Sequence, residues 1–306
     1  MRIFLTGATG FVGSRIIPEL LAAGHDVLGL TRSEKGWHQL EAAGARPHFG
    51  TIEDLESLQE GAAQADAVIH TAFDHNFATY AANCEKDHRV ITALGAALQG
   101  SDRPLIVTSA TVLGDSGDGE PALETVFNAS APIPRVATEN AARSVLASGV
   151  DVRIIRLPQV HDPVRQGLVT FYIDHARATG LAGYVDQGAD RWSAAHVSDV
   201  AQMFAAVLDR GSCGQTYHAV GEVGVSFRSI AEAVAAGLDV PLVSLSHEKA
   251  ENHFGWLAMF IGRNGAASND WTKAALGWEP AGPGLIADLQ AMDYGPVAEL
   301  GTRVAS

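Results

Sequence analysis

The segment Thr6-Gly7-Ala8-Thr9-Gly10-Phe11-Val12-Gly13 decides the fold of this chain. A short apolar run precedes it and an amphipathic stretch follows it, so the order is strand, glycine-rich turn, helix. In that context Gly7 permits a tight turn, Gly10 lets backbone N–H groups approach a pyrophosphate, and Gly13 allows helix and strand to pack closely. The helix N-terminus supplies partial positive charge for the phosphates. The segment predicts a dinucleotide site, and the agreement of position, spacing and following helix disfavours a glycine-rich turn without a ligand.

The same alternation of short apolar runs and amphipathic stretches continues through the first half of the chain. It is typical of successive βαβ units, so we predict an α/β fold with a Rossmann-type doubly wound parallel sheet. After Pro158 the rhythm loosens, and we expect a smaller, mostly helical C-terminal substrate part. The expected domains are 1–160, which binds NAD(P), and 161–306, with a return to the first domain around 191–210. Strands are expected at 3–5, 27–30, 46–48, 67–70, 105–108 and 152–157, and helices at 12–23, 34–43, 55–62, 81–98 and 136–147.

Composition limits the partners. The 306 residues are 47% hydrophobic, and 21 Lys+Arg against 35 Asp+Glu give a net charge of −14. That acidity argues against nucleic acid and anionic membranes, and no apolar run reaches the ~18 residues of a membrane span. Cys84 and Cys213 provide neither a disulfide framework nor metal-ligand spacing. The chain opens on Arg2-Ile3-Phe4-Leu5 without a signal-type segment, so we expect a cytoplasmic protein. From the composition and the absence of metal-ligand spacing, we expect a small-molecule substrate and no metal.

The end of the second strand indicates which dinucleotide binds. An NAD site usually places Asp or Glu there to bind the ribose 2′-hydroxyl. Here the strand ends in Leu30-Thr31-Arg32-Ser33, with no carboxylate. Arg32 suits a 2′-phosphate and Ser33 adds a hydrogen bond, which favours NADP(H) over NAD(H). The alternative is that Arg32 is an ordinary solvated residue.

Further segments follow the glycine-rich turn in a characteristic order. With it, they resemble the extended short-chain dehydrogenase/reductase (NAD-dependent epimerase/dehydratase-like) family, which includes nucleotide-sugar epimerases and hydroxysteroid dehydrogenases. The resemblance runs from residue 3 to about 280. The segments are Asp66–Ala72, ending in His-Thr-Ala; Val107–Gly114, with Ser109 five residues before its glycine; Arg156–Pro163; His196–Val200; and Leu276-Gly277-Trp278-Glu279-Pro280.

The resemblance implies a set of cofactor contacts. Arg32 and Ser33 would lie at the adenosine phosphate, and Thr51 and Ile52 near the adenine. Thr51 departs from the family's usual Asp. The remaining contacts would be Gly7, Thr9, Gly10, Phe11, Val12 and Gly13 at the turn, Ala72 and Phe73 along the ribose, and Pro158, Gln159 and Val160 near the nicotinamide.

The chain lacks the Tyr-x-x-x-Lys pair with which such enzymes protonate the alkoxide left by hydride transfer. No tyrosine occurs between Tyr80 and Tyr172, and no lysine occurs between Lys86 and Lys249. A tyrosine of ordinary pKa about 10 needs a nearby cation to act near neutral pH, and a spacing of four places both groups on one helix face. The absence resembles an atypical branch of the superfamily.

Counted from Ser109, the expected tyrosine falls near Pro134 or Arg135, and its partner falls near Glu139. Arg135 and Glu139 form either an exposed i,i+4 ion pair, or a site where burial beside the cofactor raises the pKa of Glu139 and makes it an acid/base group. Two further candidates are Ser109, which would hydrogen-bond a substrate oxygen, and His161, whose imidazole titrates in a useful range. A structural or solvated role is the competing interpretation for each histidine.

Two segments bear on substrate and assembly. The apolar run within 253–261 is either a buried helix or an apolar wall over the substrate pocket. Sparse basic residues in the second half disfavour a nucleotide-sugar diphosphate. By resemblance, pairing of 81–98 and 136–147 would give a homodimer. The first hypothesis is an NADP(H)-dependent oxidoreductase of a small or apolar carbonyl or alcohol; the alternatives are a non-catalytic NADP(H) sensor or regulator and a cofactor-assisted epimerase or dehydratase.

Overall fold

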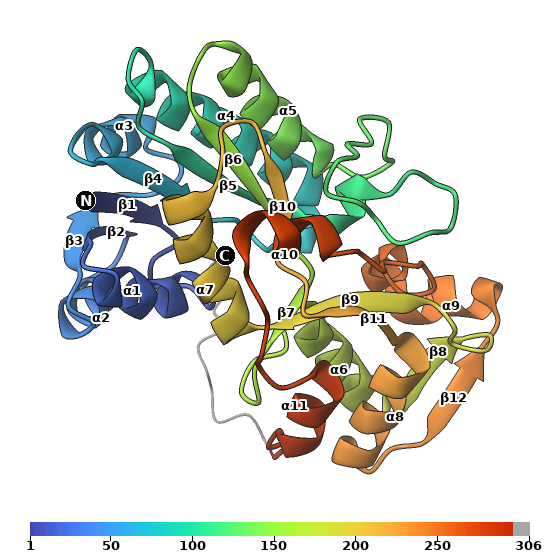
Figure 1. Cartoon of the computed structure of the whole chain (residues 1–306). Helices are drawn as coiled ribbons and strands as arrows, with labels where there is room; N and C mark the ends of the chain where they lie inside the picture. The colour runs from blue at the N-terminus through green and yellow to red at the C-terminus, as the bar shows by residue number, and fades with distance from the viewer. Residues whose placement is uncertain (296–306) are drawn as a thin grey trace.

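The computed structural model describes residues 1–295, and a seven-stranded parallel sheet organises them (Figure 1). Its strands are β1 (Arg2–Thr6), β2 (Asp26–Thr31), β3 (Arg46–Phe49), β4 (Ala67–His70), β5 (Leu105–Ala110), β6 (Val152–Leu157) and β10 (Thr216–His218). They lie in the order β10-β6-β5-β4-β1-β2-β3. The chain winds outward from β1 through β2 to β3, then crosses to the other side of β1 with β4. In open α/β sheets ligands bind at such a switch point, at the carboxyl ends of the strands.

Helices cover both faces of this sheet, which confirms the predicted doubly wound α/β fold (Figure 1). Two of these helices have a side-chain cap from the residue before their start: Ser33 accepts a hydrogen bond from the Gly36 amide of α2, and Asp54 accepts one from the Ser57 amide of α3. One face carries α1 (Gly13–Ala22), α2 (Glu34–Ala42) and α7 (Val197–Arg210), and the other carries α3 (Leu55–Ala63), α4 (Tyr80–Leu98) and α5 (Val136–Ala147).

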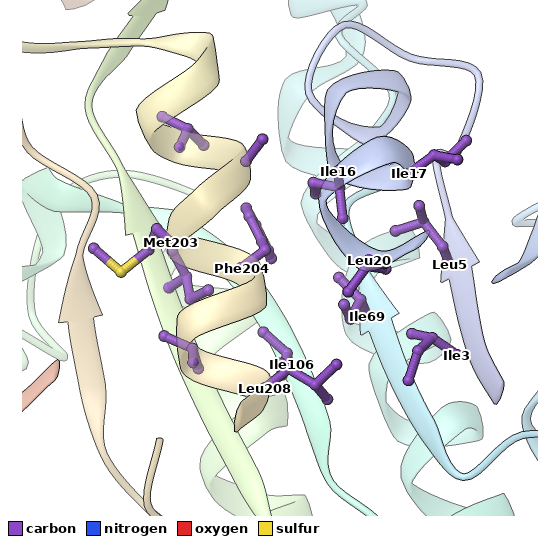
Figure 2. Close-up of a cluster of buried hydrophobic side chains, with 14 of the residues drawn as sticks. Ile3, Leu5, Ile16, Ile17, Leu20, Ile69, Ile106, Met203, Phe204 and Leu208 are labelled. Carbon is purple, nitrogen blue, oxygen red and sulfur yellow. The ribbon is translucent and has the colours of Figure 1, made fainter. Parts of the chain in front are cut away.

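The period-two alternation of β1 divides its side chains between two cores. Ile3 and Leu5 face α1 and α7, where Ile16 and Phe204 pack against them, as Figure 2 shows. Phe4, between them, belongs to the core under α3, α4 and α5. Because neighbouring residues of a strand point to opposite faces, a strand buried on both faces is a continuous apolar run. This is why the short runs of the first half are reliable strand signals.

The C-terminal part contains helices, as expected, and also two small sheets that the sequence did not indicate. One sheet has the order β11-β9-β7 and the other pairs β12 with β8. The strands are β7 (Gln159–His161), β8 (Ala182–Val185), β9 (Arg191–His196), β11 (Glu222–Ser226) and β12 (Leu242–Leu245). The helices are α6 (Leu168–Thr179), α8 (Phe227–Leu238), α9 (His247–Phe254), α10 (Asp270–Leu276) and α11 (Leu285–Ala291), with a 3₁₀ turn η3 (Gly255–Met259).

The chain crosses between the two parts more than once. After the small sheet strand β9 it re-enters the first part as α7, which packs on α1, and then as β10, which pairs with β6. Gly282 approaches Asp199 of α7, and its amide donates to that carboxylate at 2.9 Å. The two parts are therefore held together along the edge where the strands of the large sheet end. Within residues 1–295, no helix is both long and apolar enough to cross a bilayer.

Candidate active site

Three close backbone approaches build the glycine-rich turn after β1. Gly7 has a φ of +69°, in the left-handed region that favours glycine, and a Cβ there would lie 2.7 Å from the Ala72 nitrogen. The Gly10 amide donates to the Gly7 carbonyl oxygen at 2.8 Å, and a Cβ on Gly13 would collide with the same oxygen. The first N–H groups of α1, which have no intrahelical partner, are thereby held at the carboxyl edge of the sheet.

A cavity of about 660 Å³ begins at this turn and follows the carboxyl ends of the strands into the C-terminal part. This volume lies in the range of small-molecule sites. Nearly all of the cofactor contacts expected from sequence line it together: Gly7, Thr9, Gly10, Phe11, Val12, Gly13, Arg32, Thr51, Ile52, Ala72, Phe73, Pro158, Gln159 and Val160.

Ser33 is the exception among those expected contacts. It does not line the cavity, because its hydroxyl oxygen accepts a hydrogen bond from the Gly36 amide at 3.1 Å and so caps α2. Arg32, one residue earlier, does line the cavity. The turn, the helix N-terminus and a side-chain cation beyond β2 are the features that an adenine dinucleotide requires, so the residues present fit such a cofactor.

Ser109, at the end of β5, lines the cavity and is bonded to a buried cluster behind it. Its hydroxyl donates to Glu139 Oε1 at 2.8 Å. Arg156 grips the same carboxylate through both oxygens, at 2.7 and 2.9 Å, and Arg156 Nη1 lies 3.3 Å from His218 Nε2. Glu139 and Arg156 have no solvent exposure. We call Ser109, Glu139, Arg156 and His218 the serine network.

The expected ion pair between Arg135 and Glu139 does not form, and neither residue is exposed. Both carboxylate oxygens of Glu139 are engaged by Arg156, and Arg143, one turn further along α5, lies 3.7 Å away at its edge. Burial also lowers the pKa of His218 to about 3, with Arg156 adding to the effect, so the imidazole stays neutral and can accept from the guanidinium. Glu139 stands behind Ser109 and does not line the cavity.

His161 lies one residue beyond the lining residue Val160 and does not itself line the cavity. Its Nδ1 is 2.7 Å from a carboxylate oxygen of Asp288 in α11, and His196 stands 3.8 Å from that same oxygen. Burial lowers the pKa of His161, although its hydrogen bond to Asp288 opposes the shift. Within residues 1–295 its Nε2 has no hydrogen-bond partner. The ring therefore ties α11 to β7.

Arg135 is the N-cap residue that precedes α5, and it lines the cavity close to Ser109, although its side chain is nine-tenths buried. Its Nη2 donates to the carbonyl oxygen of Thr108 at 3.1 Å, and the guanidinium carbon lies 3.9 Å from the centre of the Phe73 ring. Its Nη1 lies 3.5 Å from the carboxylate of Asp87, too far and too poorly aligned for a hydrogen bond. Arg135 is thus fixed by strand ends and a ring, with hydrogen-bonding capacity left over.

A second buried chain of polar groups supports Asp87. His70 Nε2 is 2.9 Å from one Asp87 oxygen, and Thr138 donates to the other at 2.5 Å. On its far side, His70 Nδ1 lies 2.7 Å from the hydroxyl of Thr6. Burial by itself would raise the pKa of Asp87, but Arg135 and these hydrogen bonds together lower it, so the carboxylate is charged at neutral pH. We call Thr6, His70, Asp87 and Arg135 the arginine network.

Aromatic side chains from both parts of the chain close the far end of the cavity. Phe77, in the 3₁₀ turn η1 (Phe77–Thr79) after β4, stacks on Trp256 of η3, with ring centres 4.4 Å apart and planes 11° apart. Phe171 of α6 and Phe260 also contact Phe77 edge-on. Phe77, Phe171 and Phe260 line the cavity, so the run within 253–261 contributes an apolar wall to it.

Tyr80 is the one tyrosine of the cavity lining. It starts α4, where burial raises the pKa of its hydroxyl to about 12 and that of the nearby Cys84 thiol to about 11. Both groups therefore stay protonated at neutral pH. No lysine lies at the helical spacing that the usual pair requires, so the structure does not activate Tyr80 as an acid.

Comparison with known proteins now decides the family. The model of the NAD dependent epimerase/dehydratase family matches residues 3–220. The chain belongs to this family. This confirms the predicted membership of the extended short-chain dehydrogenase/reductases. The family binds NAD(P), and its members act on small-molecule substrates.

Relatives within and around the family are similar over nearly the whole chain. An uncharacterized protein of Schizosaccharomyces pombe is 42% identical over 295 residues, which cover 96% of this chain and all of the relative. The 4-hydroxy-2-methyl-3-oxo-4-farnesyl-3,4-dihydroquinoline-1-oxide ketoreductase of Stigmatella aurantiaca is 26% identical, covering 96% and 95%. A dTDP-glucose 4,6-dehydratase of Streptomyces venezuelae, solved with NAD bound, superposes with a TM-score of 0.74 at 20% identity, covering 95% and 96%. The last likeness shows the fold.

Within this epimerase/dehydratase framework, the position of Arg135 can be predicted from the sequence, but its contacts cannot. Counting from Ser109 places it where the usual tyrosine would fall, and an exposed ion pair is the simplest prediction for an arginine four residues before a glutamate. Its actual partners, Asp87 and Thr108, are distant in sequence. The sequence signal that could have indicated its importance is an arginine at the start of the helix, near the position expected for the tyrosine that this chain lacks.

Proposed function

We propose that this protein is an NADP(H)-dependent oxidoreductase of the atypical extended short-chain dehydrogenase/reductase type, acting on a small or apolar carbonyl or alcohol. The observation that carries the proposal is one continuous cavity that joins the glycine-rich turn to Ser109 and then to an aromatic wall. A nicotinamide cofactor bound there supplies or accepts hydride at a substrate carbon. The ketoreductase relative, whose printed name describes a farnesylated dihydroquinoline, supports an apolar carbonyl compound.

Ser109 is the group we propose to contact the substrate oxygen. Its proton is donated to Glu139, so toward the cavity its oxygen offers a lone pair that accepts the hydroxyl of an alcohol. Glu139, held by Arg156, fixes that orientation. His161 remains a candidate for moving a proton, since it lies one residue beyond the lining Val160.

NADP(H) is proposed over NAD(H) because Arg32 follows β2 and lines the cavity, and β2 carries no carboxylate at its end. Replacing Arg32→Asp should reverse the ratio of NADPH to NADH affinity, measured by fluorescence titration. Arg46→Asp, on the exposed surface of β3, is the matched control and should leave the ratio unchanged. An unaltered ratio in Arg32→Asp would remove the argument for the phosphate.

Turnover tests the catalytic part. Purified protein should consume NADPH in the presence of at least one member of a panel of apolar aldehydes and ketones, followed by absorbance. Because the Ser109 oxygen accepts the hydroxyl of an alcohol, Ser109→Ala should lower kcat/KM for oxidation of the corresponding alcohol, followed as NADP⁺ reduction, by about 10²- to 10⁴-fold. If Ser109→Ala and His161→Ala both leave the activity intact, the catalytic assignment is wrong.

A second candidate is a sensor that binds NADP(H) without turnover. The specific observation in its favour is Arg135 standing where the family's tyrosine would act, since a guanidinium does not release its proton in proteins. Tight NADPH binding with no oxidation across the carbonyl panel would favour the sensor. The same cofactor titration distinguishes both candidates from a chain that binds no dinucleotide.

A further inference from the structure

Three arginines line the cavity of this acidic protein, and they occupy three different places. Arg32 follows β2. The Arg165 guanidinium lies 5.4 Å from the ring of Phe11, in the glycine-rich turn. Arg135 contacts Phe73 and Thr108, which follow β4 and end β5. The first two are therefore placed for the phosphates of a dinucleotide, whereas Arg135 stands beside Ser109, at the end where chemistry would occur.

Arg135 keeps hydrogen-bonding capacity that its protein neighbours do not use. Its Nη1 has no hydrogen-bond partner within residues 1–295, and neither does the neighbouring hydroxyl of Thr108. Both residues line the cavity and both are about nine-tenths buried. Leaving a buried polar group without a partner is unfavourable, so an unpartnered donor in a cavity wall is available to a ligand.

The charges around the cavity leave Arg135 available to an anion. Glu53 and Asp74 share Lys86, at 2.8 and 3.1 Å. Asp87 faces Arg135 at 3.5 Å without a hydrogen bond, and its two carboxylate oxygens are hydrogen-bonded by His70 and Thr138. The remaining titratable neighbours are Tyr80 and Cys84, which stay protonated, and His75, whose pKa is lowered by burial and by Arg135. None of the three offers Arg135 a negative charge.

Ser109 cannot supply the hydrogen bond that a carbonyl oxygen needs while its proton is donated to Glu139. A ketone or aldehyde oxygen accepts only, and negative charge grows on it as hydride reaches the carbon. The cation next to Ser109 in the cavity wall is Arg135. A guanidinium stabilises an oxyanion through charge-assisted hydrogen bonds.

We propose that Arg135 is the anion-binding group of the substrate end of the cavity, and that the ligand class is an apolar molecule carrying one anionic oxygen. That oxygen is either a carboxylate of the ground state or the oxyanion that develops at a reacting carbonyl. The apolar remainder contacts Phe73, Phe77, Tyr80, Phe171 and Phe260. The inference rests on the proposed function for the placement of the cofactor, but the recognition of an anion is tested separately from turnover.

The experiment uses the full chain saturated with NADP⁺ and four probes measured by calorimetry. Benzoate carries a carboxylate and 4-nitrophenolate an oxyanion; benzamide and benzyl alcohol are their neutral counterparts. We expect at least one anion to bind between about 10-fold and 100-fold more tightly than its counterpart, the range that a charge-assisted hydrogen bond of 1.5–3 kcal/mol gives. Preference for benzoate identifies the ground-state carboxylate, and preference for 4-nitrophenolate identifies the oxyanion.

Variants separate recognition from folding. Arg135→Gln should abolish the anion preference while the neutral probes bind unchanged, and Arg135→Lys should restore part of it. Arg89→Gln, on the exposed face of α4, is the control and should keep the preference. If Arg135→Gln does not fold, the comparison of probes in the wild type and in Arg135→Lys still decides the matter.

The failures are distinguishable. If NADP⁺ binds but no anion is preferred over its neutral counterpart, the anion-binding role of Arg135 is wrong while the oxidoreductase proposal stands. If the preference survives in Arg135→Gln, the role is wrong as well. If the anion preference is found but no carbonyl compound is reduced, Arg135 binds an anion and the oxidoreductase proposal fails.

Discussion

The serine network and the arginine network lie behind the same row of strand ends, yet they are satisfied to different degrees. In the serine network Arg156 uses its guanidinium on Glu139, the Leu123 carbonyl oxygen and His218, and Ser109 gives its proton inward. In the arginine network, Arg135 reaches one carbonyl oxygen and faces Asp87 at 3.5 Å without a hydrogen bond. A fully satisfied network rigidifies a wall, and a partly satisfied one in a cavity is available to a ligand. The first should therefore govern stability and the second recognition.

The largest effect on stability is expected from Glu139→Ala. It leaves the guanidinium of Arg156 buried without its carboxylate, which should lower the free energy of unfolding by about 3–5 kcal/mol. Urea unfolding at pH 7 measures the loss. Glu232→Ala, which breaks the exposed pair with Arg228 in α8, is the control and should cost no more than about 0.5 kcal/mol. A loss as small as that of the control would mean that the serine network is not a structural element.

Asp87→Asn tests the arginine network and should cost about 2 kcal/mol, in the range of hydrogen bonds to a charged group. Because the folded-state pKa of Asp87 is lowered, its stabilisation is present above its ordinary value near 3.8 and is lost as the pH falls through the folded value. The wild type should therefore lose its advantage over the variant on acidification. Anion affinity should not fall in Asp87→Asn, since Arg135 loses a competing carboxylate. A fall would contradict this and would show that Asp87 is needed to position Arg135 for the anion.

The imidazole of His218 predicts a pH dependence specific to the serine network. Its folded pKa of about 3 lies below the ordinary 6.5, so the unfolded chain takes up a proton first as the pH falls. Stability should be full above pH 6.5 and decrease by roughly 1.4 kcal/mol per pH unit toward pH 3 from this group alone. In His218→Gln the free energy of unfolding should fall less steeply with decreasing pH between pH 6.5 and 5, by up to that amount. Equal slopes in the two proteins would mean that His218 does not remain neutral in the folded state.

The smallest change is expected from Ser109→Ala, and it separates stability from catalysis. The substitution removes one hydrogen bond to Glu139, whose carboxylate stays paired with Arg156, so the unfolding free energy should fall by only about 1 kcal/mol. Thermal unfolding gives this value, and the rate of NADP⁺ reduction with the alcohol gives the accompanying loss of activity. If the unfolding free energy fell by 3 kcal/mol or more, lost activity could not be assigned to a catalytic role of Ser109, and Ser109 would be a structural residue.

The part of the cavity around Ser109 shows where prediction from sequence stops. Ser109 lies near the end of β5, a strand that the sequence predicts, whereas Val160 lies on β7, in a small sheet that the sequence did not indicate. Both residues line the cavity. Glu139 and Arg135 are four residues apart on one helix, and local spacing predicts that they pair with each other. Each instead meets a partner brought by another element, Arg156 from β6 and Asp87 from α4. Long-range partners of this kind leave no periodic signal in the chain.

The sequence by itself determined the glycine-rich turn, because the order strand, turn, helix and the cation after β2 depend on residues close together in the chain. Local backbone sterics require glycine at 13, where a Cβ would collide with the Gly7 carbonyl oxygen. The tertiary structure decided the two small sheets, the stacking of Phe77 on Trp256, and the burial of Glu139 and Arg135. One physical reason applies to all of them: which distant strands and helices pack against a charged or aromatic side chain decides whether it is solvated or buried.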